Sequence, residues 1–166
     1  METVMNSQTI VVVSTFSVIA YALVSGVFLA FSGVVMPSLA ASNPAGAIQS
    51  MQIINRKVFP TVFMVLLIGM AILSPLLVGW VLWRGAGPAE PWILAAGASY
   101  MLGVFIVTLV FNVPMNERLH RMDAQGAIAE AYWRRYVPGW TFWNTIRWVA
   151  SVISAACMLM AILTLN

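Results

Sequence analysis

The sequence predicts an all-α integral membrane protein, a four-helix bundle with helical extensions at one membrane face. Hydrophobic residues make up 61% of the 166 residues and charged residues 8%, against roughly half and a quarter in soluble domains. Four apolar runs are each long enough to cross the hydrocarbon layer, which takes about 20 residues. Together with their loops they use nearly the whole chain, so we expect one membrane domain over residues 1–166.

The first span is expected at residues 10–37. Within it Ala22, Gly26 and Ala30 recur every four residues and form a stripe of small side chains on one helix face. Such stripes let helices approach closely in lipid. We therefore expect the chain to form a homo-oligomer through this face. The single cysteine, Cys157, lies inside the last apolar run, and we expect it to be a small buried core residue.

The other spans are expected at residues 58–83, 92–111 and 140–165. A mildly amphipathic segment, 47–57, leads into the second span. A short turn over 85–91 makes the second and third spans antiparallel neighbours. The connection over 112–139 holds most of the charge, and we expect it to form helical extensions of spans three and four with a turn near Gln125-Gly126.

The charge distribution predicts the topology and excludes one class of partner. The net charge of +3 comes from eight basic residues without a basic run, so we expect no nucleic-acid partner. Most basic residues fall on the loops at one side, and the positive-inside rule then places both termini outside and the charged loops in the cytoplasm. The basic residues on that side are Arg56, Lys57, Arg118, Arg121, Arg134 and Arg135, against Arg84 on the other.

Polar side chains at helical spacing predict a site at the membrane boundary. An amide or guanidinium in hydrocarbon costs several kcal/mol unless it is paired or lines a cavity. Four spans bring the Asn55 region to the same face as two polar stripes, so we expect a polar-lined, aromatic-walled cavity there. An aromatic belt, helix-tying amides and a snorkelling Arg147 are the alternatives. The stripes are Asn112, Asn116 and His120, and Trp133, Tyr136, Trp140, Asn144 and Arg147.

His120 is the only histidine. A zinc site needs three or four ligands, so one histidine cannot build it within one chain, and we expect no metal site. Imidazole exchanges protons near neutral pH, which suits a general base. It can also supply one axial ligand to haem. A solvent-exposed histidine just past a helix end is the plain alternative.

Four motifs are spread along nearly the whole chain: the segment 26–33 running into Met36-Pro37, Met51-Gln52-x-x-Asn55, Asn112-Val113-Pro114-Met115-Asn116-x-x-Leu119, and Trp133-x-x-Tyr136-x-x-x-Trp140-x-x-x-Asn144-x-x-Arg147. With these motifs the chain resembles the anthrone oxygenase family of small four-span membrane proteins. The family name comes from members that resemble enzymes oxidising anthrones to anthraquinones without metal or flavin, whereas most bacterial members have no assigned substrate. The resemblance implies a protein of the bacterial inner membrane. The residues carried over are Asn55, Asn112, Asn116, Trp133, Trp140, Asn144 and Arg147.

The resemblance implies a cofactor-independent oxidation of a planar phenolic or quinol-like molecule by O2. In this hypothesis Arg147 and the three asparagines Asn112, Asn116 and Asn144 hold oxygens of the substrate. Asn55 completes the polar wall, and Trp133, Tyr136 and Trp140 line the ring system. The proton is removed by His120, Tyr136 or water. Two rival hypotheses are a redox protein binding haem b through His120 or a methionine, and a non-enzymatic small-molecule binding or transport module.

Overall fold

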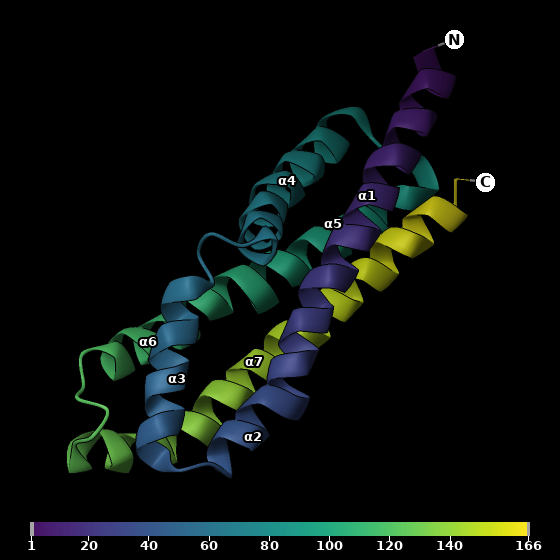
Figure 1. The fold of residues 1–166 in the computed structure, drawn as a ribbon. Helices are drawn as coiled ribbons and strands as arrows, with labels where there is room; N and C mark the ends of the chain where they lie inside the picture. The colour runs from purple at the N-terminus through teal and green to yellow at the C-terminus, as the bar shows by residue number, and fades with distance from the viewer. Residues whose placement is uncertain (1, 166) are drawn as a thin grey trace.

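The computed structural model describes residues 2–165, with side chains described from Gln8 onward. Every regular element in that part of the chain is a helix. Four helical segments are long and apolar enough to cross a membrane: Gln8–Ala40, Val62–Arg84, Gly87–His120 and Ala127–Leu163. They pack side by side in an elongated bundle, with the start of α1 and the end of α7 at one end (Figure 1). The predicted four-span fold is confirmed.

The first span is α1 (Glu2–Ala30), a π-helical segment η1 (Phe31–Val35) and α2 (Met36–Ala40). After a short turn, α3 (Pro44–Lys57) folds back along the bundle. Its start is capped by Asn43, whose side chain accepts hydrogen bonds from the backbone N–H groups of Ala45 and Gly46 at 3.1 and 3.4 Å. Asparagine at this position satisfies amides that have no partner within the helix.

The second span, α4 (Val62–Arg84), begins later than the expected residue 58. Pro60 lacks an N–H and disfavours helical geometry at the residue before it, so the helix breaks at this position instead of running through it. Thr61 then caps the new helix, because its hydroxyl accepts the N–H of Met64 at 3.3 Å. The result is a corner over residues 58–61 between α3 and α4.

The third span is assembled from several helical pieces. Gly85 ends α4 with a φ of 76°, a conformation that glycine adopts without strain. A 3-10 turn, η2 (Gly87–Ala89), leads into α5 (Glu90–Tyr100), two π-helical segments η3 (Met101–Ile106) and η4 (Thr108–Asn112), and α6 (Val113–His120). The third span therefore extends past the expected residue 111, which confirms the predicted helical extension.

The last helix, α7 (Ala127–Leu163), is continuous and contains both the predicted extension and the fourth span. It remains helical through Pro138 and Gly139. The turn before it contains the hydrogen bond from Gly126 N–H to the Asp123 carbonyl at 2.9 Å, at the predicted place. The end of the bundle that carries α3, α6 and residues 121–126 is called the polar end below (Figure 1).

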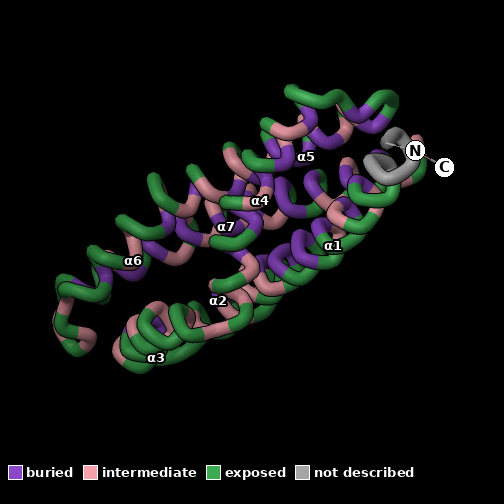
Figure 2. The backbone as a smooth tube through the Cα atoms, turned by 90° about the horizontal axis from the view of Figure 1, so that it is seen from above, coloured by how far each residue is buried: buried purple, intermediate pink, exposed green. Residues whose placement is uncertain are grey.

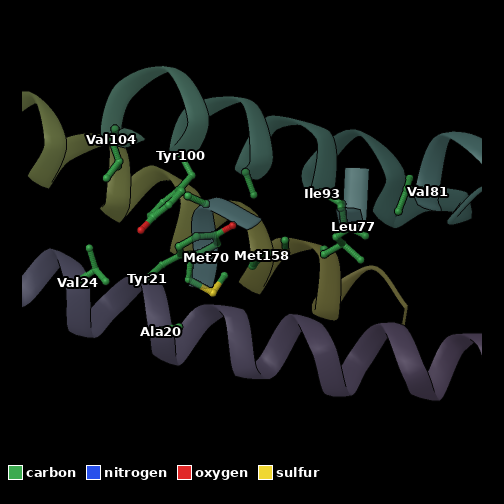
Figure 3. Packing of buried hydrophobic residues seen from close by; sticks show 14 of the residues in the cluster. Ala20, Tyr21, Val24, Met70, Leu77, Val81, Ile93, Tyr100, Val104 and Met158 are labelled. Carbon is green, nitrogen blue, oxygen red and sulfur yellow. The ribbon is translucent and has the colours of Figure 1, made fainter. Parts of the chain in front are cut away.

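Buried residues occur along the length of the bundle (Figure 2). They form two clusters. Tyr21, Met70, Tyr100 and Met158 belong to the larger cluster, which lies between the spans (Figure 3). There Tyr21 and Ser74 share a 2.7 Å hydrogen bond, and the Tyr100 hydroxyl donates to the Leu67 carbonyl at 3.1 Å. The smaller cluster belongs to the polar end and joins α2, α3, α6 and the start of α7. Cys157 is half-buried beside the larger cluster, not enclosed as expected.

Two glycines allow close helix approach in the larger cluster. A Cβ at Gly97 would stand 2.5 Å from Val78 Cγ2 of α4, and one at Gly103 would overlap Ala150 of α7. The predicted stripe on α1 behaves differently. Ala22, Gly26 and Ala30 are exposed, and a Cβ at Gly26 would meet no atom within 4 Å. The stripe does not pack within the chain, and the homo-oligomer stays a prediction.

Candidate functional site

A cavity of about 340 Å³ lies between the spans, next to the polar end of the bundle. Its walls come from α1 and η1, α3, the α3–α4 corner, α4, the third span and α7. Most lining residues are apolar or aromatic, whereas the polar ones come from α3, the third span and α7. The polar and charged members are Asn55, Arg56, Thr108, Asn112, Asn116, Glu117, His120, Asn144 and Arg147.

Arg147 is the central charged group of this cavity. Its side chain is 6% exposed, and its guanidinium lies 4.4 Å from the ring centroid of Phe28 and 5.3 Å from that of Trp140. Nη1 donates to Thr108 Oγ1 at 3.3 Å and Nη2 to Asn144 Oδ1 at 2.7 Å. No carboxylate among the described residues forms an ion pair with it. A buried cation that neutral groups alone surround favours an anionic occupant.

Asn144 fixes the position of Arg147 and joins α7 to the first span. Its Nδ2 donates to the Phe28 carbonyl and to Ser32 Oγ, both at 2.7 Å, while its Oδ1 accepts from Arg147. Ser32 Oγ also shares a 3.0 Å hydrogen bond with Thr145 Oγ1. Both amide protons of Asn144 are therefore used within the protein, and Asn144 orients the guanidinium.

Three buried polar atoms on the cavity wall make no hydrogen bond within the described chain: Asn55 Nδ2, Asn112 Oδ1 and Arg147 Nε. Asn112 is 1% exposed, and its Nδ2 donates to the Trp140 carbonyl at 3.3 Å, which leaves its oxygen free. Buried polar groups are nearly always hydrogen-bonded. The acceptor Asn112 Oδ1 and the donor Arg147 Nε therefore suit a ligand or water in this cavity, whereas the Asn55 side chain also interacts with the Tyr136 hydroxyl.

Asn116 binds two aromatic side chains of α7 through its amide oxygen. Its Oδ1 accepts from the Tyr136 hydroxyl at 2.7 Å and from Trp140 Nε1 at 2.8 Å. Trp140 lines the cavity, but Tyr136 and Trp133 do not. Trp133 stacks on Tyr136 with ring centroids 5.3 Å apart, and both belong to the smaller core cluster. Trp133 and Tyr136 therefore lie in the core beside Trp140 and not on the cavity wall, and their expected contact with a ligand stays a prediction.

The π-helical segments of the first and third spans coincide with the cavity. Phe31 of η1, Phe105 of η3, and Thr108 and Asn112 of η4 all line it. π-Helical turns are rare and are found mostly at functional sites. Here they turn an aromatic wall and two polar side chains toward the same space.

His120 lies at the exposed rim of the cavity, at the end of α6. Arg56 and Glu117 share this rim. The polar stripes thus separate into a buried group around Arg147 and an exposed group at the polar end. Among the described residues, no three His, Cys, Asp or Glu side chains are close enough to hold a metal ion.

Comparison with known proteins adds one finding. The sequence model of the family described as "Anthrone oxygenase" matches residues 49–157. The chain belongs to this family. No curated protein and no solved structure matches the chain.

The segment that matches the anthrone oxygenase family contains every site residue predicted from the sequence. It excludes Phe28 and Ser32 of the first span, which complete the surroundings of Arg147 and Asn144. The candidate site is therefore built partly from residues before the matched segment.

Sequence reasoning missed four residues of the candidate site, namely Thr108, Phe28, Ser32 and Glu117. Thr108 precedes Asn112 by four residues and would have been found by extending the asparagine stripe backward. Phe28 and Ser32 lie in the segment 26–33 that resembles the family, but nothing in their spacing indicates a contact with Arg147. Glu117 is adjacent to Asn116 and lines the rim.

Proposed function

We propose that the protein is a membrane-embedded oxygenase that binds a planar phenolic or quinol-like molecule as an oxyanion at Arg147 and oxidises it with O2. One observation carries the proposal: a buried guanidinium without a carboxylate partner faces a cavity of about 340 Å³ whose wall holds further unpaired polar atoms. The volume suits a small organic ligand, because such pockets span roughly 300–1,000 Å³. Membership of the anthrone oxygenase family supports this substrate class.

The unpaired atoms predict which polar groups the ligand carries on its oxygenated edge. Arg147 Nε is a donor and suits a phenolate or enolate oxygen, whereas Asn112 Oδ1 is an acceptor and suits a hydroxyl hydrogen. Charge-assisted hydrogen bonds of this kind are about twice as strong as neutral ones. Phe28, Phe31 and Trp140 line the cavity as aromatic walls against which a ring can stack.

The reaction draws all its electrons from the substrate, so the proposal requires no resident cofactor. In an anthrone-type substrate, which carries a ring CH2, a base removes one proton from that CH2, and the resulting anion is stabilised by Arg147. The anion passes one electron to O2, and the radical and superoxide combine to a carbon-bound peroxide that takes up the proton. Loss of the second C–H proton with cleavage of the O–O bond leaves a C=O group and one water. Substrate CH2 and O2 thus become C=O and H2O.

His120 is our candidate for the base. It is the cavity-lining side chain whose type exchanges protons near neutral pH, and its place on the rim lets it pass a proton to solvent. Glu117 lines the same rim, and its carboxylate is the second candidate for the base. Tyr136 is not on the cavity wall and donates its hydroxyl to Asn116, which argues against it as the base.

The topology and the rival functions remain proposals. By the positive-inside rule, we propose that the polar end of the bundle faces the cytoplasm. We also propose that the protein lies in a bacterial inner membrane. A haem b protein with His120 as an axial ligand predicts a Soret band in the purified protein. A transport module predicts ligand flux without oxygen consumption. No specific contact described above favours either rival over the oxygenase.

The decisive experiment measures oxygen uptake with an anthrone, corrected for its spontaneous oxidation, in nanodiscs. The unaltered protein is expected to consume one O2 per anthrone, and Arg147→Met to lose this activity while remaining folded. Arg135→Met is the matched control, because Arg135 is an exposed arginine of the same helix outside the cavity. Absence of uptake above background with the unaltered protein, or full uptake with Arg147→Met, would refute the proposal.

A further inference from the structure

The cavity is not closed toward the side of the bundle. At the polar end α3 holds α6, because Gln52 Nε2 donates to the carbonyls of Leu119 and Met122, each at 2.9 Å. Further along the axis α4 approaches η3 of the third span. Between these two contacts, no Cα of α4 lies within 8 Å of a Cα in η4 or α6. Here cavity-lining residues on both sides are also exposed, so the cavity opens between α4, with its preceding corner, and the third span. This opening is called the window below, and its residues are Phe59, Ile68, Leu109 and Val113.

Apolar side chains frame this window from both sides. Phe59 of the corner and Ile68 of α4 are 66% and 44% exposed, and Leu109 and Val113 of the third span are 51% and 39% exposed. All four also line the cavity. Ile68 and Leu109 are exposed apolar residues of segments long and apolar enough to cross a membrane, which favours lipid hydrocarbon as the surroundings of this side of the cavity.

Polarity changes across the cavity from the inner wall to the window. The inner wall carries Asn112, Asn144 and Arg147, which are 1%, 0% and 6% exposed. The window side carries Phe59, Ile68, Leu109 and Val113, without a polar side chain among them. A ligand with oxygens on both edges would bury one polar edge against this apolar frame, which costs free energy. The cavity therefore fits a molecule with one oxygenated end and one hydrocarbon end.

We propose that the ligand is a lipid-resident amphiphile whose oxygenated ring sits at Arg147 and whose aliphatic chain leaves through the window into the bilayer. This inference rests on the proposed function for the ring's position at Arg147, and it does not depend on oxidation. The chain stays in hydrocarbon in both the free and the bound state, because lipid tails are as apolar as the side chains of the window. Chain length beyond the window should therefore leave affinity unchanged.

The cavity has a second exit, which gives the proposal a clear competitor. Arg56, Glu117 and His120 line the cavity at its exposed, polar rim. A ligand that entered from water would use this exit and place any substituent among charged side chains. The two routes end at different residues, so the position of the chain decides between them.

Photo-crosslinking in phosphatidylcholine nanodiscs tests the proposal. The probe is a naphthol ring bearing a dodecyl chain with a diazirine near the middle of that chain. After irradiation we expect adducts on the window residues, which excess naphthol without a chain competes away. Adducts on Arg56, Glu117 or His120, or adducts spread evenly over exposed apolar residues such as Leu23 and Val152, would overturn the proposal.

A matched pair of variants tests the window itself. Leu109 and Val110 are neighbours in η4 and are 51% and 54% exposed, but only Leu109 lines the cavity. Leu109→Trp fills the window and should lower the competable adduct yield by about fivefold or more, whereas Val110→Trp should change it by less than about twofold. Equal yields for the two variants, both recovered in nanodiscs as folded protein, would place the chain elsewhere.

The outcome is separable from that of the proposed function, because crosslinking needs no oxygen consumption. Adducts at the window together with absent oxygen uptake would refute the oxidation and support the lateral ligand. Adducts at the polar rim together with normal uptake would refute the lateral ligand and leave the oxidation standing.

Discussion

Replacement of Asn144 by aspartate tests whether the uncompensated charge of Arg147 holds the ligand. The two side chains have nearly the same shape, and Asn144 Oδ1 already accepts Arg147 Nη2 at 2.7 Å. In Asn144→Asp a carboxylate at that position neutralises the guanidinium. Two unit charges about 4 Å apart at an effective dielectric constant of about 20 interact by about 4 kcal/mol. The aspartate therefore repels an anionic ligand about as strongly as the arginine attracts it.

The expected loss is about 2–4 kcal/mol of ligand binding, which is roughly 30- to 1,000-fold in Kd. Aspartate cannot make the two hydrogen bonds that Nδ2 donates to the Phe28 carbonyl and to Ser32 Oγ. The fold should survive, because the Ser32 hydroxyl can donate to the carboxylate instead and the new ion pair offsets the bond lost at Phe28. The assay is the Kd of a naphthol that is ionised at the assay pH, measured by fluorescence in nanodiscs. Its methyl ether, which carries no charge, is the internal control and should bind both proteins equally.

The reasoning is refuted if folded Asn144→Asp binds the ionised ligand within about threefold of the unaltered protein. It is also refuted if the ether loses as much affinity as the ionised ligand. That second result would mean that the substitution had deformed the cavity, and the charge of Arg147 would then not be the cause.

Three further predictions concern packing, assembly and the base. Gly97→Ala should lower the free energy of unfolding by about 1–3 kcal/mol, because its Cβ would stand 2.5 Å from Val78 Cγ2. Gly26→Ala, whose Cβ would meet nothing within 4 Å, should leave stability unchanged. Equal thermal midpoints for the two variants would contradict the close approach at Gly97. Gly26→Leu should convert the predicted homo-oligomer to monomers in native mass spectrometry, and an unaltered protein that is already monomeric would end that prediction. His120→Gln should lower kcat for oxygen uptake by about 10² with little change in KM; an unchanged kcat would transfer the base to Glu117 or water.

The fold followed from the sequence because hydrocarbon leaves a chain few options. Backbone groups have no water to bond with in a bilayer, so a long apolar run must be helical. The positions at which helices end were harder to predict from the sequence. Pro60 is compatible with the first turn of a helix as well as with a corner, and the cap formed by Thr61 decided between the two.

The candidate site was predicted in part. Asn112, Asn144 and Arg147 were expected together because each is costly in hydrocarbon, and all three line one cavity. Helical spacing could not separate the residues that face the cavity from those behind them. Trp133, which lies about two helical turns from Trp140, follows the same stripe but stacks on Tyr136 in the core. The π-helical turns change the angle between successive side chains, and no local pattern in the sequence marks them.

The glycine contacts at Gly97 and Gly103 have a mechanical consequence. They draw the third span against α4 and α7 where the larger cluster lies, and α4 and η4 separate only beyond this point. The window can therefore widen by a hinge motion. The helix packing at Gly97 and Gly103 stays in place, and the α3–α4 corner moves. Backbone amides near Gly97 should then exchange their hydrogens with solvent more slowly than those next to Phe59, so the rigid and the yielding parts of the molecule divide along its length.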